Sequence, residues 1–265
     1  MRLMLKGVSS VLLEVQGLTK HFGGVAAVKD VGFKVDQGTI FALIGPNGAG
    51  KTTVFNLITG MLQPDGGAIN LLGKRLDGLK PYQVAAAGIT RTYQNLQLFS
   101  GMTVLENVMT GAHLKGKTGF IKSIFRTPGI NAEDKQITEQ SMELLGEVGL
   151  DSFASLPAAA LPFGQQRLLE IARALASGPR LVLLDEPAAG LNSTETKTLA
   201  SFLKKLRKSG LTMILVEHDM ETVMEVADRI TVLNFGQGIA EGTPAEVQAD
   251  REVIRAYLGE DELIA

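Results

Sequence analysis

Apolar and polar residues follow two different patterns along the chain, one typical of strands and one typical of helices. Alternating apolar positions at Val31, Phe33 and Val35 predict a strand with one buried face over 32–35. Other short apolar runs predict further strands over 11–15, 39–44, 68–72, 181–184, 211–216 and 230–234. The first third of the chain is therefore expected to be rich in β-structure.

From about residue 96 the spacing of apolar residues becomes helical. Thr103 and Glu106 have the spacing of a capping box that opens a helix. Further helices are predicted over 131–149, 165–177 and 194–208, and Thr243 with Pro244 begins a C-terminal helical tail. Strands that alternate with helices form a mainly parallel sheet, whose ligands bind at the carboxyl ends of the strands. The pattern predicts an α/β fold.

The composition excludes several classes of protein. The chain has 265 residues, 45% of them hydrophobic, and a formal net charge of −2, which argues against a nucleic-acid partner held by bulk charge. It has no cysteine, so disulfides and thiolate metal sites are excluded, as fits a cytosolic protein. The N-terminal stretch lacks the pattern of a secretory signal peptide. No window approaches the roughly 18 apolar residues of a membrane span, so at a membrane other chains would have to cross it.

Residues 45–52, Gly-Pro-Asn-Gly-Ala-Gly-Lys-Thr, match the pattern of a phosphate-binding loop. A predicted strand precedes them and a predicted short helix over 51–58 follows, which is the context that the motif requires. The glycines let backbone N–H groups turn toward an anion, Lys51 adds a charge for the β- and γ-phosphates, and Thr52 offers a hydroxyl to Mg²⁺. The alternative is an accidental glycine-rich turn. We predict a nucleotide site formed by Asn47, Gly48, Ala49, Gly50, Lys51, Thr52 and Thr53.

Two acidic residues follow the apolar run over 181–184. Asp185 and Glu186 could be solvated residues at the end of a core strand. With a phosphate loop upstream, the functional interpretation is favoured: Asp185 would hold Mg²⁺ or its water, and Glu186 would polarise the attacking water as general base.

Three further segments carry a resemblance to one family. Leu-Pro-Phe-Gly-Gln at 161–165 precedes the helix that leads to Asp185, Gln94 lies within Arg-Thr-Tyr-Gln-Asn at 91–95, and His218 follows a predicted strand. In this order, and over nearly its whole length, the chain resembles the ATP-binding subunit of an ATP-binding cassette (ABC) transporter. The resemblance implies ATP hydrolysis with Mg²⁺ on a P-loop NTPase (RecA-like) core, with an N-terminal antiparallel β subdomain and an inserted α-helical subdomain.

The resemblance also implies roles for single residues. Phe22 matches the aromatic residue that stacks on adenine, although it could simply be a packing residue. Gln94 matches the glutamine that senses Mg²⁺ and the attacking water and that contacts the membrane subunit. His218 matches the histidine that contacts the γ-phosphate, although an isolated histidine is more often structural. Gly164 and Gln165 belong to the signature motif, which binds nucleotide across a head-to-tail pair of cassettes.

The signature departs from its common form, Leu-Ser-Gly-Gly-Gln. Pro162 replaces the serine and Phe163 the first glycine, so a hydroxyl and an N–H that could reach a γ-phosphate are absent. Asn192 likewise replaces an acid that is usual in the short loop after Glu186. In this family each signature closes the partner's phosphate loop. We therefore expect a heterodimer whose other cassette has the intact signature.

These features narrow the resemblance to importer cassettes for branched-chain amino acids. Similar segments occur at 91–99, 102–108, 161–173, 185–192, 217–220 and 254–260. The resemblance implies a second ATPase subunit, two membrane permease subunits, an extracytoplasmic solute-binding protein, and a peripheral position on the cytoplasmic face of the membrane. Urea or aromatic-acid import is the alternative within the family. A soluble cassette ATPase, a GTPase or a small-molecule kinase is the alternative outside it, and no guanine-reading motif is present.

The same resemblance implies a single ATPase domain over residues 11–260. Within it, 11–95 and 166–240 form the nucleotide-binding core with its β subdomain, 96–165 the helical subdomain, and 241–265 the C-terminal tail. Residues 113–131 carry basic side chains interleaved with apolar ones and no acids. This stretch is expected to be a solvated insertion, with contact to the membrane subunits or to anionic lipid as the alternative.

Overall fold

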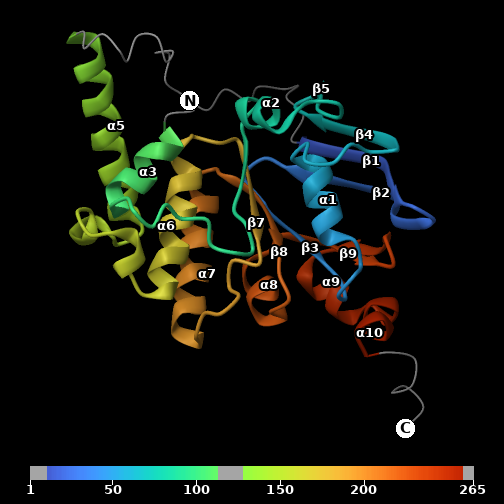
Figure 1. Cartoon of the computed structure of the whole chain (residues 1–265). Coiled ribbons are helices and arrows are strands. Elements are labelled where there is room, and N and C mark those ends of the chain that lie inside the picture. Colours follow the sequence, from blue (N-terminus) through green and yellow to red (C-terminus); the bar gives the residue numbers. More distant parts are fainter. Residues whose placement is uncertain (1–10, 113–127, 259–265) are drawn as a thin grey trace, which may run out of the picture. The chain divides into compact units, whose positions relative to one another are not determined.

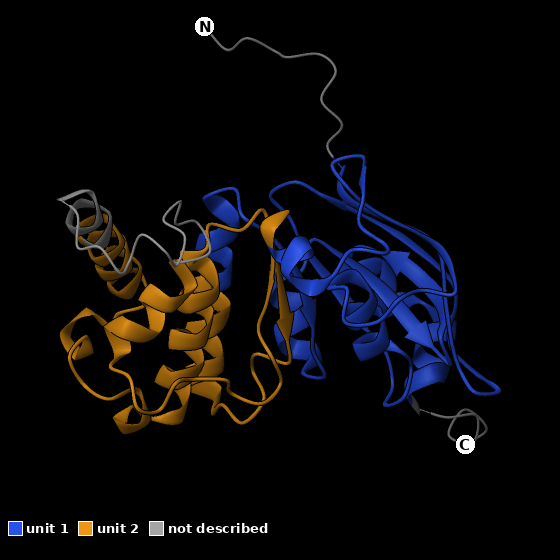
Figure 2. Cartoon of the chain, turned by 45° about the horizontal axis from the view of Figure 1, so that its top comes forward, with its two compact units in different colours: residues 1–85, 203–265 blue, residues 86–202 orange. Residues whose placement is uncertain are grey.

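The computed structural model describes residues 11–112 and 128–258 of the chain. Residues 1–10 of the N-terminal stretch, residues 113–127 of the basic stretch 113–131 and residues 259–265 of the tail lie outside these residues. The chain divides into two compact units, residues 1–85 with 203–265 and residues 86–202 (Figure 2). Each unit is described by itself.

The first unit contains an antiparallel sheet with the strand order β2-β1-β4-β5. Its strands are β1 (Val11–Phe22), β2 (Val25–Asp36), β4 (Gly66–Leu71) and β5 (Lys74–Arg75). Val15 of β1 pairs with Phe33 of β2 and with Ile69 of β4, which confirms the predicted N-terminal antiparallel part. β1 and β2 are longer than predicted because register shifts, such as the one between Val15 and Leu18, break the apolar alternation.

A second set of strands in this unit has the order β10-β9-β3-β8. β3 (Ile40–Ile44) pairs in parallel with β8 (Thr212–Val216) and β9 (Arg229–Asn234), and β10 (Gln237–Gly242) is antiparallel to β9. Every residue of β3 and β8 is buried, as continuous apolar runs predict. The helices of the unit are α1 (Lys51–Ile58), α8 (Met220–Val226), α9 (Pro244–Ala249) and α10 (Arg251–Leu258), while α2 (Pro81–Ala86) ends at its boundary (Figure 1).

The second unit combines one parallel strand pair with a group of helices. β6 (Ile89–Arg91) pairs with β7 (Leu181–Asp185). The helices are α3 (Val104–Ala112), α5 (Pro128–Glu147), α6 (Phe163–Ala176) and the first part of α7 (Ser193–Lys208). Short 3-10 turns cover Asp151–Phe153 and Ala158–Ala160.

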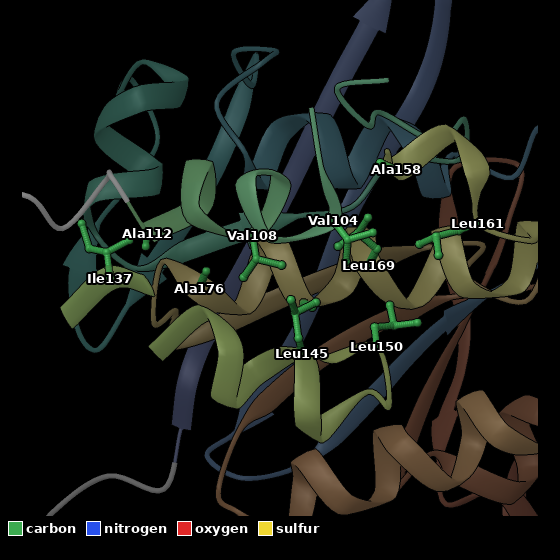
Figure 3. Packing of buried hydrophobic residues seen from close by; sticks show 11 residues of the cluster. Val104, Val108, Ala112, Ile137, Leu145, Leu150, Ala158, Leu161, Leu169 and Ala176 are labelled. Atoms are coloured by element: carbon green, nitrogen blue, oxygen red, sulfur yellow. The ribbon is translucent and has the colours of Figure 1, made fainter. Parts of the chain in front are cut away.

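A hydrophobic core holds α3, α5 and α6 together. Val108, Leu145 and Leu169 are fully buried in it and point toward one another from the three helices (Figure 3). α3 and α6 pack closely at Gly111, where a Cβ atom would collide with the backbone carbonyl of Arg173. Glycine is therefore required at this crossing.

The boundaries predicted for two helices were wrong at both ends. α5 begins at Pro128 and ends at Glu147, where 131–149 was predicted, and α6 begins at Phe163 and ends at Ala176, where 165–177 was predicted. Pro162 is the N-cap of α6 with φ −55° and ψ 153°, an extended conformation that suits proline, so the helix begins directly after it. The predicted capping box of Thr103 with Glu106 is formed. The predicted helix start at Thr243 and Pro244 is also confirmed, and there the structure adds a second capping box, between Thr243 and Glu246.

Candidate functional site

The loop between β3 and α1 has the backbone shape that a phosphate cradle needs. Gly50 is the N-cap of α1 in the left-handed conformation, with φ 102°. A Cβ atom on Gly50 would lie 2.5 Å from the carbonyl oxygen of Ala27, and one on Gly45 would collide with the carbonyl of Leu233. Both positions therefore exclude a side chain, and the N-terminus of α1 is left open to an anion.

The residues predicted to bind nucleotide in this loop differ in solvent exposure. Lys51 is 6% exposed, and its Nζ donates to the carbonyl oxygens of Gly45 at 2.6 Å and Pro46 at 3.0 Å. Asn47, Gly48 and Thr52 are exposed, Gly50 and Thr53 are half-buried, and Ala49 is buried. The ammonium group of Lys51 is thus already folded back over the loop whose phosphate it is predicted to bind.

A cavity of about 930 Å³ lies beside this loop. It is lined by Asn47 and Gly48 of the loop, by Phe235 of the β9–β10 turn, and by Arg255 and Ala256 of α10. One residue further along α10, burial raises the pKa of the Tyr257 hydroxyl, and a hydrogen bond from the Gly45 backbone lowers it to a smaller extent. The C-terminal tail therefore reaches the phosphate loop itself.

Phe22 lies at the end of β1 and is 48% exposed. Nζ of Lys20, two residues earlier in β1, lies 5.9 Å from the centre of the Phe22 ring. The same Nζ donates a hydrogen bond to Oδ1 of Asp65 at 2.7 Å. Asp65 also accepts a hydrogen bond from the His21 backbone at 2.7 Å, and with Lys20 as the main cause its pKa falls to about 2. Asp65 thus anchors the strand end that carries the predicted adenine contact.

His218 follows β8 directly and is exposed. Its backbone N–H donates to Oε2 of the buried Glu217 at 3.1 Å. The next residue, Asp219, is the N-cap of α8 and accepts a hydrogen bond from the Glu221 backbone. His218 is therefore held between a strand end and a capped helix start, with its ring at the surface.

In the second unit, the predicted metal ligand Asp185 ends β7 and is engaged by an arginine. Nη2 of Arg91 lies 2.6 Å from Oδ2 of Asp185, and the two side chains are only 6% and 5% exposed. The guanidinium carbon of Arg91 lies 5.2 Å from the centre of the Tyr93 ring. The Asp185 backbone N–H donates to the Thr92 hydroxyl at 3.4 Å. Arg91, the last residue of β6, thus holds the carboxylate in place.

The predicted general base is brought together with the predicted sensing glutamine. Nε2 of Gln94 donates to Oε2 of Glu186 at 2.8 Å. Glu186 has φ 48°, a left-handed conformation that is uncommon and costly for a residue with a side chain. Such strained residues are concentrated at functional sites, and Glu186 is one directly after the end of β7.

The signature segment packs against the loop that follows Glu186 and against the first turn of α7. A Cβ atom on Gly164 would lie 2.5 Å from Oε1 of Glu195, and one on Gly190 would lie 3.0 Å from the ring of Phe163. Asn192 accepts hydrogen bonds from the backbone of Thr194 and Glu195, both at 3.0 Å, and so caps α7. Asparagine caps helices as well as aspartate does, which explains why this departure is tolerated locally.

The start of α6 keeps only part of the predicted binding potential. Pro162 makes no side-chain hydrogen bond as N-cap, and Phe163 is 46% exposed. Gly164 is buried, and Oε1 of Gln165 is buried without a hydrogen-bond partner among the described residues. The backbone N–H groups of the first turn remain the main donors there.

Within each unit, then, the structure groups the predicted residues. Phe22, the phosphate loop and His218 belong to the first unit, and Gln94, Asp185, Glu186, Gly164 and Gln165 to the second. Sequence reasoning missed the roles of Arg91, Arg167 and Glu170, which are buried charges that contact the Gln94 segment or Asp185. For Arg167 and Glu170, the sequence signal would have been a charge at an otherwise apolar position of α6.

Two further properties bear on cofactors and membranes. Across residues 11–112 and 128–258, no cluster of three or more histidine or carboxylate side chains could hold a metal by itself. Mg²⁺ commonly takes one or two carboxylates plus substrate phosphates, so Asp185 and Thr52 are suitable ligand types. None of the described helices has the length and apolar content to cross a bilayer.

Comparisons with known proteins identify two matching families. The profile of the ABC transporter family matches residues 28–189. The profile described as branched-chain amino acid ATP-binding cassette transporter matches residues 239–262, which include α9 and α10.

Curated relatives match over almost the whole chain. The high-affinity branched-chain amino acid transport ATP-binding protein BraF of Pseudomonas aeruginosa is 46% identical, covering 96% of this chain and 100% of the relative. The corresponding protein LivG of Escherichia coli K12 is 44% identical with the same coverage.

Solved structures with the same fold are ATP-binding cassettes. A nucleotide-free cassette from an ABC transporter has a TM-score of 0.82 and 32% identity, covering 94% of this chain and all of that one. The ADP conformation of another cassette has a TM-score of 0.83 and 31% identity, covering 95% and 100%. A dimeric cassette bound to ADP and phosphate has a TM-score of 0.74 and 26% identity, covering 88% and 99%. The fold is that of a P-loop NTPase.

Proposed function

Because the chain belongs to the family of ABC transporter ATP-binding subunits, we propose that it hydrolyses ATP to power the import of branched-chain amino acids through separate membrane subunits. The ATPase part of this proposal is carried by one observation, the 2.8 Å hydrogen bond between Gln94 and Glu186 at the end of β7. The choice of solute rests on relatives named for branched-chain amino acid transport and on the matching tail.

In the proposed reaction, the phosphate loop and the N-terminus of α1 bind the β- and γ-phosphates, with Lys51 as the charged donor. Phe22 stacks on the adenine. Glu186 accepts a proton from the attacking water that Gln94 orients, and His218 contacts the γ-phosphate. Thr52, Asp185 and Gln94 would hold Mg²⁺, which would neutralise charge on the phosphates when bound.

We further propose that the active site is completed by a second cassette. Two of the solved structures with this fold are dimeric ATP-binding cassettes. In this chain the start of α6 has no capping side chain at Pro162, so its contribution to the partner's nucleotide is the weaker one. The working assembly is therefore a heterodimer on two permease subunits, fed by an extracytoplasmic solute-binding protein, with both cassettes peripheral at the cytoplasmic face.

Uptake by the intact organism tests the function. Deleting the gene should abolish high-affinity uptake of labelled leucine, isoleucine and valine, and expression of the wild-type chain should restore it. Lys51→Ala should not restore it. Uptake that persists after deletion, or that Lys51→Ala restores, would contradict the proposal. If the deletion abolished only the uptake of urea or of aromatic acids, the proposed ATPase activity would stand and the proposed solute would be wrong.

Pairing is tested with purified chains. On size-exclusion chromatography, the chain with Glu186→Gln should stay monomeric with ATP when alone and should dimerise with its partner cassette. Full ATP-dependent homodimerisation with normal turnover would count against a heterodimer.

A further inference from the structure

Arg167 is the largest fully buried side chain in the described part of the protein, with 1% exposure. It lies in α6, four residues after the helix begins at Phe163. Arginine is almost never fully buried unless it is paired, because desolvating its charge is costly. The contacts of Arg167 therefore indicate what the buried charge is for.

The hydrogen bonds of Arg167 go to its helix neighbour Glu170 and to the segment around Gln94. Nη1 donates to Oε2 of Glu170 at 2.8 Å and to the carbonyl oxygen of Tyr93 at 3.0 Å, and Nη2 donates to the carbonyl oxygen of Gln94 at 3.0 Å. Glu170, also 1% exposed, accepts a hydrogen bond from the Tyr93 backbone N–H at 3.4 Å. A guanidinium fork can bind two successive carbonyls at once, which a lysine ammonium cannot do with the same geometry.

The segment that is held in this way has little other main-chain support. β6 ends at Arg91, and the last hydrogen bond that continues its pairing runs from the Thr92 N–H to the Leu183 carbonyl at 2.9 Å. At Tyr93 and Gln94 the backbone is hydrogen-bonded instead by the buried side chains of Arg167 and Glu170. The Gln94 side chain then reaches Oε2 of Glu186. A shift of the backbone here would move the Gln94 amide directly.

We propose that Arg167, paired with Glu170, is a positioning residue that fixes Gln94 against Glu186 and ties this contact to the first turns of α6. The signature residues Phe163 and Gly164 begin the same helix as Arg167. A displacement of the signature therefore moves the Arg167 guanidinium group and, through it, Gln94. The inference rests on the proposed roles of Gln94 and Glu186 in ATP hydrolysis.

The test uses the purified transporter complex and a paired variant. Arg167→Met alone would leave Glu170 as an unpaired buried charge and endanger folding, whereas replacing both members of a buried pair with apolar residues is often neutral for stability. We therefore combine Arg167→Met with Glu170→Leu. The variant should keep its urea-unfolding midpoint and its ATP affinity within about twofold, because the phosphate loop is unchanged, and should lose at least about tenfold in kcat.

Two comparisons separate positioning from general damage. Arg167→Lys keeps the charge pair and should restore kcat only in part. Arg207→Met removes an arginine that pairs with Asp228 in the first unit, and it should leave kcat unchanged. A paired variant and a lysine variant that both hydrolyse ATP at the wild-type rate would overturn the proposal.

A double-mutant cycle with Gln94→Ala gives the decisive outcome. If Arg167 acts through Gln94, the paired substitution should lower kcat no further in the Gln94→Ala background. Fully multiplicative losses would overturn the positioning role and leave the proposed function standing. Wild-type turnover by Gln94→Ala itself would instead contradict the catalytic role of Gln94.

Discussion

Replacing Arg91 with methionine should destabilise the chain strongly, although Arg91 is not predicted to touch ATP. The substitution keeps much of the apolar stem but removes the cation 2.6 Å from Asp185, in a pair whose side chains are 6% and 5% exposed. Breaking a buried pair from one side costs about 3–5 kcal/mol, because the remaining charge stays desolvated. Loss of the contact with the Tyr93 ring adds up to about 1–2 kcal/mol.

Equilibrium urea unfolding without nucleotide and Mg²⁺ measures this loss. Adding Asp185→Asn to Arg91→Met should recover part of it, since the unpaired charge is then gone. Lys204→Met serves as the control, because its pair with Glu225 is 38% and 44% exposed and such pairs contribute about 1 kcal/mol or less. An Arg91→Met loss below about 1 kcal/mol, or no recovery in the double variant, would refute the claim that Asp185 is held as a buried charge.

Three other substitutions probe separate parts of the chain. Gly164→Ala should lower turnover several-fold, because the new methyl group would lie 2.5 Å from Oε1 of Glu195. The control Gly146→Ala has open space around the new methyl group in α5, so it should be neutral or raise the free energy of unfolding by about 0.5–1 kcal/mol. Asp65→Asn should raise the KM for ATP by loosening Lys20 and His21 at the end of β1. The folded-state pKa of Asp65 is lowered to about 2, so its contribution is present above its ordinary pKa of 3.8 and is lost as pH falls toward 2; an unchanged KM in Asp65→Asn at pH 7 would contradict this role. Thr243→Ala should cost about 1 kcal/mol in thermal unfolding through loss of the capping box, and an unchanged Tm would be inconsistent with it.

The elements predicted best are those defined by local signals. The buried strands β3 and β8 and the phosphate loop with α1 lie almost where continuous apolar runs and glycine spacing placed them. β10 was missed because Gln237–Gly242 contains two glycines and no apolar run, and pairing with β9 defines it. Long-range pairing overrides weak local propensity in such strands.

The residues of the candidate site could be predicted from the sequence, but the buried arginines that hold them in place could not. Motif spacing and the family resemblance named Asp185, Glu186 and Gln94, and the structure adds the contact between the last two. Arg91 ends the short strand β6 and Arg167 lies in helix α6, and a charged residue in either kind of element is usually solvated. Their burial depends on partners distant in sequence, which no local pattern reveals. The chemical roles of the site residues remain predictions.

Simultaneous measurement of ATP hydrolysis and labelled leucine uptake in proteoliposomes tests the central claim most directly. The complex that contains this chain and its partner subunits should take up leucine only while ATP is hydrolysed. Glu186→Gln in this chain should abolish most hydrolysis and uptake together while ATP binding persists. Leucine uptake at the wild-type rate with hydrolysis lost, or unchanged hydrolysis in Glu186→Gln, would contradict the account.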